Sequence, residues 1–65
     1  MPIARIEMLL GRSQETKDRI AQEVTHILAR ELRVDPDHVY VMFSEVAPND
    51  WSVGGRRLNA PDKPS

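Results

Sequence analysis

The residue with the most unusual possible reactivity is Pro2, which directly follows Met1. Methionine aminopeptidase removes an initial methionine before small second residues, and the chain would then begin with a secondary amine. An α-amino group has an ordinary pKa of about 7.7–8.0, and burial or neighbouring cations lower that pKa. A neutral amine near pH 7 is an efficient general base. Many chains begin Met-Pro without a catalytic reason, and retention of Met1 would leave Pro2 as a non-basic amide.

Three further side chains are suited to binding a small organic acid. Arg12 lies between Gly11 and Ser13, and its guanidinium can hold a carboxylate through two parallel hydrogen bonds. The Tyr40 hydroxyl can donate to a carbonyl or enolate oxygen, and Trp51 can wall an apolar pocket. Each also has an ordinary structural explanation: a solvated arginine, a packed tyrosine and an interface tryptophan.

Composition excludes several other kinds of site. The chain has no cysteine, and its two histidines, His26 and His38, lack the spacing of metal ligands. We therefore expect no metal site. Nine basic residues against ten acidic ones give a net charge of −1, which does not fit a nucleic-acid-binding surface. No secretory leader or membrane span is apparent, so a cytoplasmic protein is predicted.

The elements that must position these residues follow a strand–helix–strand order. Residues 2–10 alternate apolar and charged side chains, which predicts a strand with one covered face. Residues 14–32 repeat apolar side chains at helical spacing after Ser13, a good N-cap. Residues 39–46 are β-branched and aromatic and indicate a strand that needs cover on both faces. Such a βαβ unit has parallel strands.

The sequence after residue 46 predicts a turn at residues 47–50 and a short hairpin near Gly54 and Gly55. We expect one domain over residues 1–58 and a flexible tail over residues 59–65. A 65-residue chain is marginally stable alone. Two strands and one helix cannot cover both faces of a sheet, so a second copy is expected to supply the missing cover.

Together these pieces resemble the 4-oxalocrotonate tautomerase family over residues 1–58. The resemblance is carried by Pro2-Ile3-Ala4, Leu10-Gly11-Arg12-Ser13, Glu23-Val24, Ser44-Glu45 and Trp51-Ser52-Val53-Gly54-Gly55. It implies an α/β fold of short βαβ subunits with a C-terminal hairpin. Two subunits complete a four-stranded sheet backed by two helices, and three such dimers usually form a hexamer.

The resemblance also implies a cofactor-independent isomerase that moves a proton within a small unsaturated 2-keto acid. Pro2 matches the family's amino-terminal general base, and Arg12 matches an arginine that binds a substrate carboxylate from a neighbouring subunit. Trp51 stands where the family has an aromatic residue, usually phenylalanine. The chain departs from the family at Tyr40, where the best-known members have a second arginine. This departure favours a monocarboxylate or smaller keto acid as substrate.

Two alternatives stay open at this point. A hydratase or dehalogenase of unsaturated or halogenated acids would use Pro2 with an acidic water activator, for which Glu45 and Asp50 are candidates. A non-catalytic oligomeric module would keep the fold alone, because fold does not determine function. In every case we expect self-association and no nucleic-acid or membrane partner.

Overall fold

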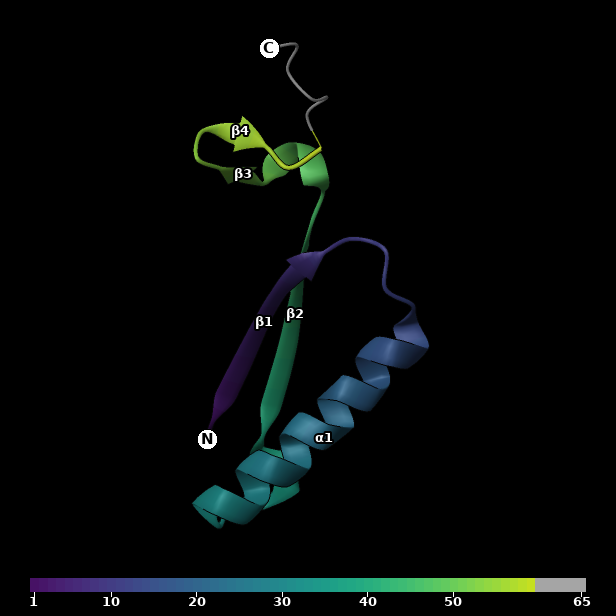
Figure 1. Ribbon diagram of the computed structural model, residues 1–65. Coiled ribbons are helices and arrows are strands. Elements are labelled where there is room, and N and C mark those ends of the chain that lie inside the picture. The colour runs from purple at the N-terminus through teal and green to yellow at the C-terminus, as the bar shows by residue number, and fades with distance from the viewer. Residues whose placement is uncertain (60–65) are drawn as a thin grey trace.

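The computed structural model describes residues 1–59 and confirms the predicted strand–helix–strand order. Its main elements are β1 (Ile3–Leu9), α1 (Gln14–Leu32) and β2 (Tyr40–Val46). The two strands pair in parallel, from Ile3 beside Tyr40 to Leu9 beside Val46 (Figure 1). The smaller elements are the 3-10 turns η1 (Pro36–His38) and η2 (Pro48–Asp50) and the hairpin strands β3 (Ser52–Val53) and β4 (Arg56–Arg57).

Helix α1 begins and ends where its sequence provides caps. The Ser13 hydroxyl accepts a hydrogen bond from the Thr16 main-chain N–H at 3.1 Å, which satisfies one of the free donors of the first turn. Arg33 takes the left-handed conformation with φ 57°, and its N–H donates to the Ala29 carbonyl. Pro36 follows within one turn and prevents the helix from continuing.

The helix packs on one face of the two-stranded sheet. The half-buried side chains of this layer are Ala4, Ile6 and Met8 from β1, Ile20, Val24 and Leu28 from α1, and Val41 and Phe43 from β2. Within residues 1–59 no side chain is fully buried. One copy of the chain therefore has an apolar layer but no closed core.

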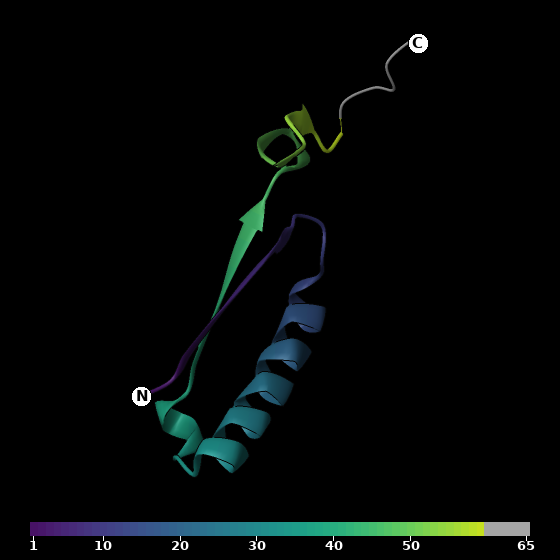
Figure 2. The ribbon, with the colours of Figure 1, turned by 60° about the vertical axis from the view of Figure 1, so that its left-hand side comes forward.

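The opposite face of the sheet is open. Figure 2 shows both strands nearly edge-on, with α1 on one side of them. On the other side Ile3, Tyr40 and Met42 are 58%, 50% and 42% exposed. The radius of gyration is 16.3 Å, whereas a compact domain of this length has about 11 Å. The predicted need for cover on both faces of β2 is thus unmet in one copy.

The hairpin projects past the carboxyl end of β2 (Figure 1). Gly54 and Gly55 have φ of 61° and 84°, and this pair of positive values is what a tight two-residue hairpin turn requires. The predicted hairpin is confirmed. Asn59 donates a side-chain hydrogen bond to Asn49 at 2.7 Å. The boundary at Leu58 stays a prediction, because residues 60–65 of the predicted tail lie outside the described residues.

The described part of the chain contains no helix that is long and apolar enough to cross a membrane. Over the same residues, no three histidine or acidic side chains gather in a way that could hold a metal ion.

Candidate active site

The four predicted site residues lie at two opposite ends of the β1–β2 ribbon. Because the strands are parallel, their amino ends share one end of the sheet and their carboxyl ends share the other. Pro2 and Tyr40 lie at the amino end. Arg12 follows β1 and Trp51 follows β2, so both lie at the carboxyl end.

At the amino end, the main chain fixes Pro2 beside Tyr40. The Tyr40 N–H donates to the Pro2 carbonyl at 3.0 Å, which extends the ladder one residue before β1. Pro2 is half-buried, and the Tyr40 side chain lies on the open face of the sheet, as does that of its register partner Ile3. The Pro2 nitrogen is joined to the exposed Met1, and an amide nitrogen cannot accept a proton because its lone pair is delocalised. Removal of Met1 would expose the amine at a position that the β2 backbone already sets.

At the carboxyl end, Arg12 lies between a strand end and a helix start. The Leu10 N–H donates to the Val46 carbonyl at 3.1 Å, and Gly11 then turns the chain with φ 119°. Arg12 is exposed and immediately precedes Ser13, the N-cap of α1. The Arg12 charge therefore adds to the positive end of the α1 dipole, and together they favour binding of an anion at this position.

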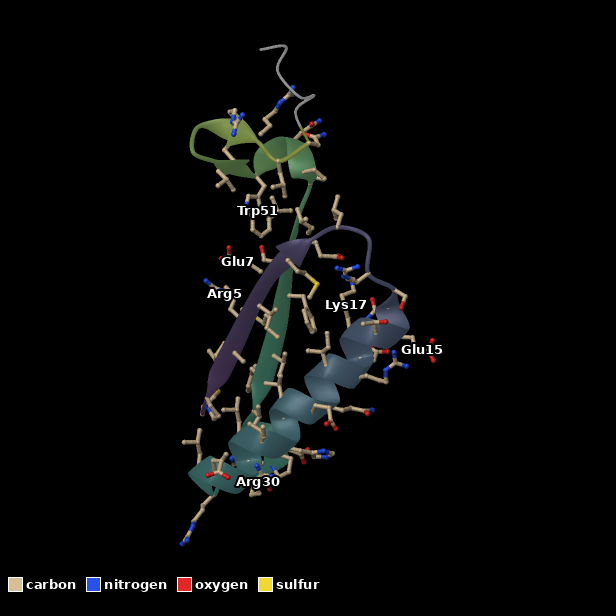
Figure 3. The ribbon with its side chains drawn as sticks, viewed as in Figure 1. Arg5, Glu7, Glu15, Lys17, Arg30 and Trp51 are labelled. Atoms are coloured by element: carbon tan, nitrogen blue, oxygen red, sulfur yellow. The ribbon has the colours of Figure 1, made fainter. Side chains whose placement is uncertain are left out.

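Trp51 is anchored through its main chain at the base of the hairpin. Its N–H donates to the Pro48 carbonyl at 3.3 Å, and its carbonyl accepts from the Leu58 N–H at 2.7 Å. The side chain is half-buried, and Figure 3 shows it at the end of the ribbon where β1 finishes. This indole surface is the large apolar element at the end of the sheet that carries Arg12.

One copy of the chain does not bring the two ends together. Leu10 lies eight positions after Pro2, and a strand rises about 3.3 Å per residue, so the ends lie about 26 Å apart. A small acid bound to Arg12 cannot reach Pro2 of the same copy. A complete set of the four residues requires the amino end of one copy and the carboxyl end of another.

Sequence reasoning missed an ion pair between the helix and the sheet. Lys17 Nζ lies 2.9 Å from Glu45 Oε1, and the two side chains are 14% and 27% exposed. Glu45 is on the α1 side of β2, opposite Tyr40, and its carboxylate is engaged with the helix. Asp50, the other acidic candidate, is exposed in η2. The clue in the sequence was that Glu45 shares the alternation of Val41 and Phe43 on the covered face.

Comparison with known proteins gives one consistent result. Residues 2–60 match the family described as tautomerase enzyme. A probable tautomerase of Ralstonia nicotianae is 32% identical over 56 residues, which cover 86% of each chain. A probable tautomerase of Lactiplantibacillus plantarum is 36% identical over 55 residues, covering 85% of this chain and 86% of the other.

Solved structures agree with this match. The heterohexamer 4-oxalocrotonate tautomerase from Chloroflexus aurantiacus superposes with a TM-score of 0.82 at 36% identity, over 89% of this chain and 94% of that one. A crystal structure of a 4-oxalocrotonate tautomerase homologue gives a TM-score of 0.88 at 25% identity, over 97% and 100% of the two chains.

Proposed function

The chain belongs to the tautomerase enzyme family, and from that premise we propose that it is a cofactor-independent isomerase of a small unsaturated 2-keto acid. The observation that carries this proposal is the position of Pro2. The family match begins at Pro2 and not at Met1, and the Tyr40 backbone holds Pro2 at the end of the sheet.

In the proposed mechanism, Met1 is removed and the Pro2 amine takes a proton from the carbon next to the substrate carbonyl. The Pro2 ammonium then returns that proton to another carbon of the conjugated system. Arg12 holds the substrate carboxylate through its guanidinium. The Tyr40 hydroxyl donates to the carbonyl oxygen as negative charge develops on it. Trp51 lines the pocket and keeps water from the reacting atoms. Only a proton moves, so these residues require no cofactor.

The site is proposed to be shared between copies of the chain. The separation of about 26 Å between Pro2 and Leu10 supports a shared site, because a small acid is too short to contact both ends of one copy. The open face of the sheet supports self-association, since Ile3 and Tyr40 are at least half exposed there. The heterohexamer of Chloroflexus aurantiacus shows that a relative of this fold assembles.

Tyr40 sets the proposed substrate class. A tyrosine hydroxyl donates one neutral hydrogen bond, whereas an arginine offers a charge and a bidentate fork. With Arg12 as the cation that binds substrate, the site fits one carboxylate. We therefore propose a monocarboxylate keto acid, with a dicarboxylate as the poorer substrate.

The hydratase alternative gains no support from the position of Glu45. A water activator needs a carboxylate free to accept a proton, and Glu45 is paired with Lys17 at 2.9 Å. Asp50 stays as the candidate for that reaction. Two measurements distinguish the non-catalytic alternative from the isomerase and the hydratase: whether Met1 is removed, and whether the protein turns over a substrate.

The test is ketonisation of 2-hydroxymuconate and phenylenolpyruvate by tag-free protein across a range of pH. Intact mass first establishes that Met1 is absent. We expect the rate to rise with pH through one ionisation, because the amine is a base only above its pKa, and we expect the monocarboxylate to be preferred. Pro2→Ala is the control, and undiminished turnover by this variant would refute the base assignment. No rate above buffer for either enol, with Met1 absent, would refute the isomerase proposal.

A further inference from the structure

The C-terminal hairpin has two faces of different chemistry. Its strands pair antiparallel, with Val53 opposite Arg56, and the Leu58 N–H donates to the Trp51 carbonyl at 2.7 Å. Opposite residues of an antiparallel pair share a face, and successive residues along each strand alternate between the faces. One face is therefore apolar with a single charge, and the other is polar: the first carries Trp51, Val53, Arg56 and Leu58, and the second carries Ser52 and Arg57.

Arg56 is the exception on the apolar face. Val53 and Leu58 on that face are 62% and 46% exposed. Arg56 is also exposed and forms no ion pair with another residue in the part of the chain that the structure describes. When a bound molecule covers the apolar face, the Arg56 guanidinium loses water and needs an anion in its place, whereas Arg57 on the polar face keeps its water.

Arg56 lies close to the Trp51 indole. It precedes Leu58 by two residues, so it is the diagonal cross-strand neighbour of Trp51, and such neighbours lie about 7–8 Å apart. An arginine side chain spans that distance and can stack on the indole, which would orient the planar guanidinium. Arg12 belongs to the same end of the molecule, because it follows β1 where the hairpin projects past β2 (Figure 1).

We propose that Arg56 is a second carboxylate-binding residue, which lies beside Trp51 and holds the same carboxylate as Arg12. A carboxylate has two oxygens with about four lone-pair positions, so two guanidinium groups can bind it together. Both cations then lie at one end of the site and the Tyr40 end has none, which fits a monocarboxylate. The role in catalysis rests on the proposed function, whereas binding of a carboxylate at the hairpin does not require turnover.

Arg57 supplies a matched control, because it is the next residue, has the same charge and lies on the opposite face of the hairpin. Trp51 is the one tryptophan of the chain, so its fluorescence reports binding at this face. The probe is hydrocinnamate, a monocarboxylate without a keto group. We expect Arg56→Gln to raise its dissociation constant about 10-fold or more, because a charge-assisted contact is lost. Arg57→Gln should leave that constant within about twofold of wild type.

The neutral amide of the probe separates recognition of charge from apolar packing. Hydrocinnamide should bind wild type and Arg56→Gln equally, because it has no carboxylate. Arg56→Lys keeps the charge without the planar fork and should lose less affinity for the acid than Arg56→Gln. Equal dissociation constants of Arg56→Gln and Arg57→Gln for the acid would overturn the proposal. An equal loss for acid and amide, or no binding of hydrocinnamate by wild type, would overturn it as well.

The competing role for Arg56 is an ion pair with an acidic side chain of another copy. In that case Arg56→Gln would have a lower molar mass than wild type and would regain affinity for hydrocinnamate at higher protein concentration. We expect instead that the molar masses of Arg56→Gln and Arg57→Gln equal that of wild type. A lower mass with recovery of affinity would assign Arg56 to contacts between copies and would overturn the proposal.

Turnover separates this proposal from the proposed function. If wild type is active, Arg56→Gln should raise KM for phenylenolpyruvate about 10-fold with a smaller change in kcat, because Arg56 holds the carboxylate in ground state and transition state alike. An unchanged KM in that variant would overturn the role of Arg56. An inactive wild type that still binds hydrocinnamate through Arg56 would instead refute the proposed function and leave the binding site supported.

Discussion

At the scale of single residues, the hydrogen bond between Tyr40 and Pro2 separates two roles of Tyr40. Its main-chain N–H holds the Pro2 carbonyl at 3.0 Å, and this contact survives any side-chain substitution other than proline. Its hydroxyl is the group that we propose to act on the substrate. The position of the amine and the recognition of the substrate can therefore be altered one at a time.

The role of the amine is tested with two synthetic chains that differ only in Met1. A chain that retains Met1 has an amide at Pro2, and loss of a general base lowers turnover by about 10²–10⁴-fold. We expect that loss in kcat/KM for an enol substrate, with the same circular dichroism spectrum for both chains. Equal activity of the two chains would exclude Pro2 as the base.

The role of the Tyr40 hydroxyl is tested by the ratio of two substrates. Tyr40→Arg adds a charge-assisted contact, so kcat/KM for 2-hydroxymuconate should rise relative to phenylenolpyruvate by about 10-fold or more. Tyr40→Phe should lower kcat on both substrates. His38→Arg, which adds the same charge at an exposed neighbouring position, is the control and should leave the ratio unchanged. An unchanged ratio in Tyr40→Arg would remove Tyr40 from the site.

At the scale of elements, the start of α1 supports both stability and the site. Ser13 caps the helix and directly follows Arg12, and one turn later Lys17 attaches the helix to β2 through Glu45. The loop that carries Arg12 is therefore held at its helical end by two side-chain contacts.

Removing the N-cap should cost stability by a known mechanism. Ser13→Ala leaves the Thr16 N–H without its acceptor, which should lower the free energy of unfolding by about 1 kcal/mol. Ser13→Asp keeps an acceptor and should stay close to wild type. Urea denaturation at one fixed protein concentration measures both. Equal losses in the two variants would show that the hydroxyl does not act as a cap.

The Lys17–Glu45 pair should couple more strongly than an exposed pair on the same helix. A double-mutant cycle with Lys17→Met and Glu45→Gln should give a coupling free energy of about 0.5–1 kcal/mol, since both side chains are partly shielded from solvent. Glu15 and Arg19 lie 3.9 Å apart and are largely exposed, so their cycle should give close to zero. Loss of turnover in Glu45→Gln without loss of stability would point to a chemical role instead.

At the scale of the whole molecule, one copy is an open layer with no fully buried side chain among its described residues. We therefore expect contacts between copies to supply much of the stability, because a chain of this size buries little surface alone. We expect the thermal midpoint to rise with protein concentration. Each tenfold increase in concentration should raise the apparent free energy of unfolding by about 1.4 kcal/mol for each pairing step. Scanning calorimetry over a hundredfold range of concentration measures this, and a constant midpoint would indicate a self-sufficient monomer.

The sequence predicts those structural features of the chain that depend on residues close together in the sequence. Ser13 and Pro36 bound α1, and Gly54 with Gly55 makes the hairpin turn, so these elements followed from neighbouring residues. The contact between Lys17 and Glu45 joins residues 28 apart in the chain, and no local pattern encodes it.

The candidate site shows the same limit. The sequence indicated which residues suit the chemistry, but the distance between Pro2 and Arg12 follows from the parallel pairing of β1 and β2. Ile27 and Leu32 belong to the apolar helical pattern, yet they are 51% and 53% exposed. Periodicity gives the direction of a side chain and does not say what covers it.

One edge of β1 pairs with β2, and among the described residues no strand pairs with its other edge. A newly made chain at low concentration presents an unpaired strand edge, and such edges recruit other strands into aggregates. Arg5 and Glu7 interrupt that edge, because an unrelated strand that docks there must bury or oppose a charge. These two charges are therefore expected to deter pairing with wrong strands and to limit aggregation of newly made chains.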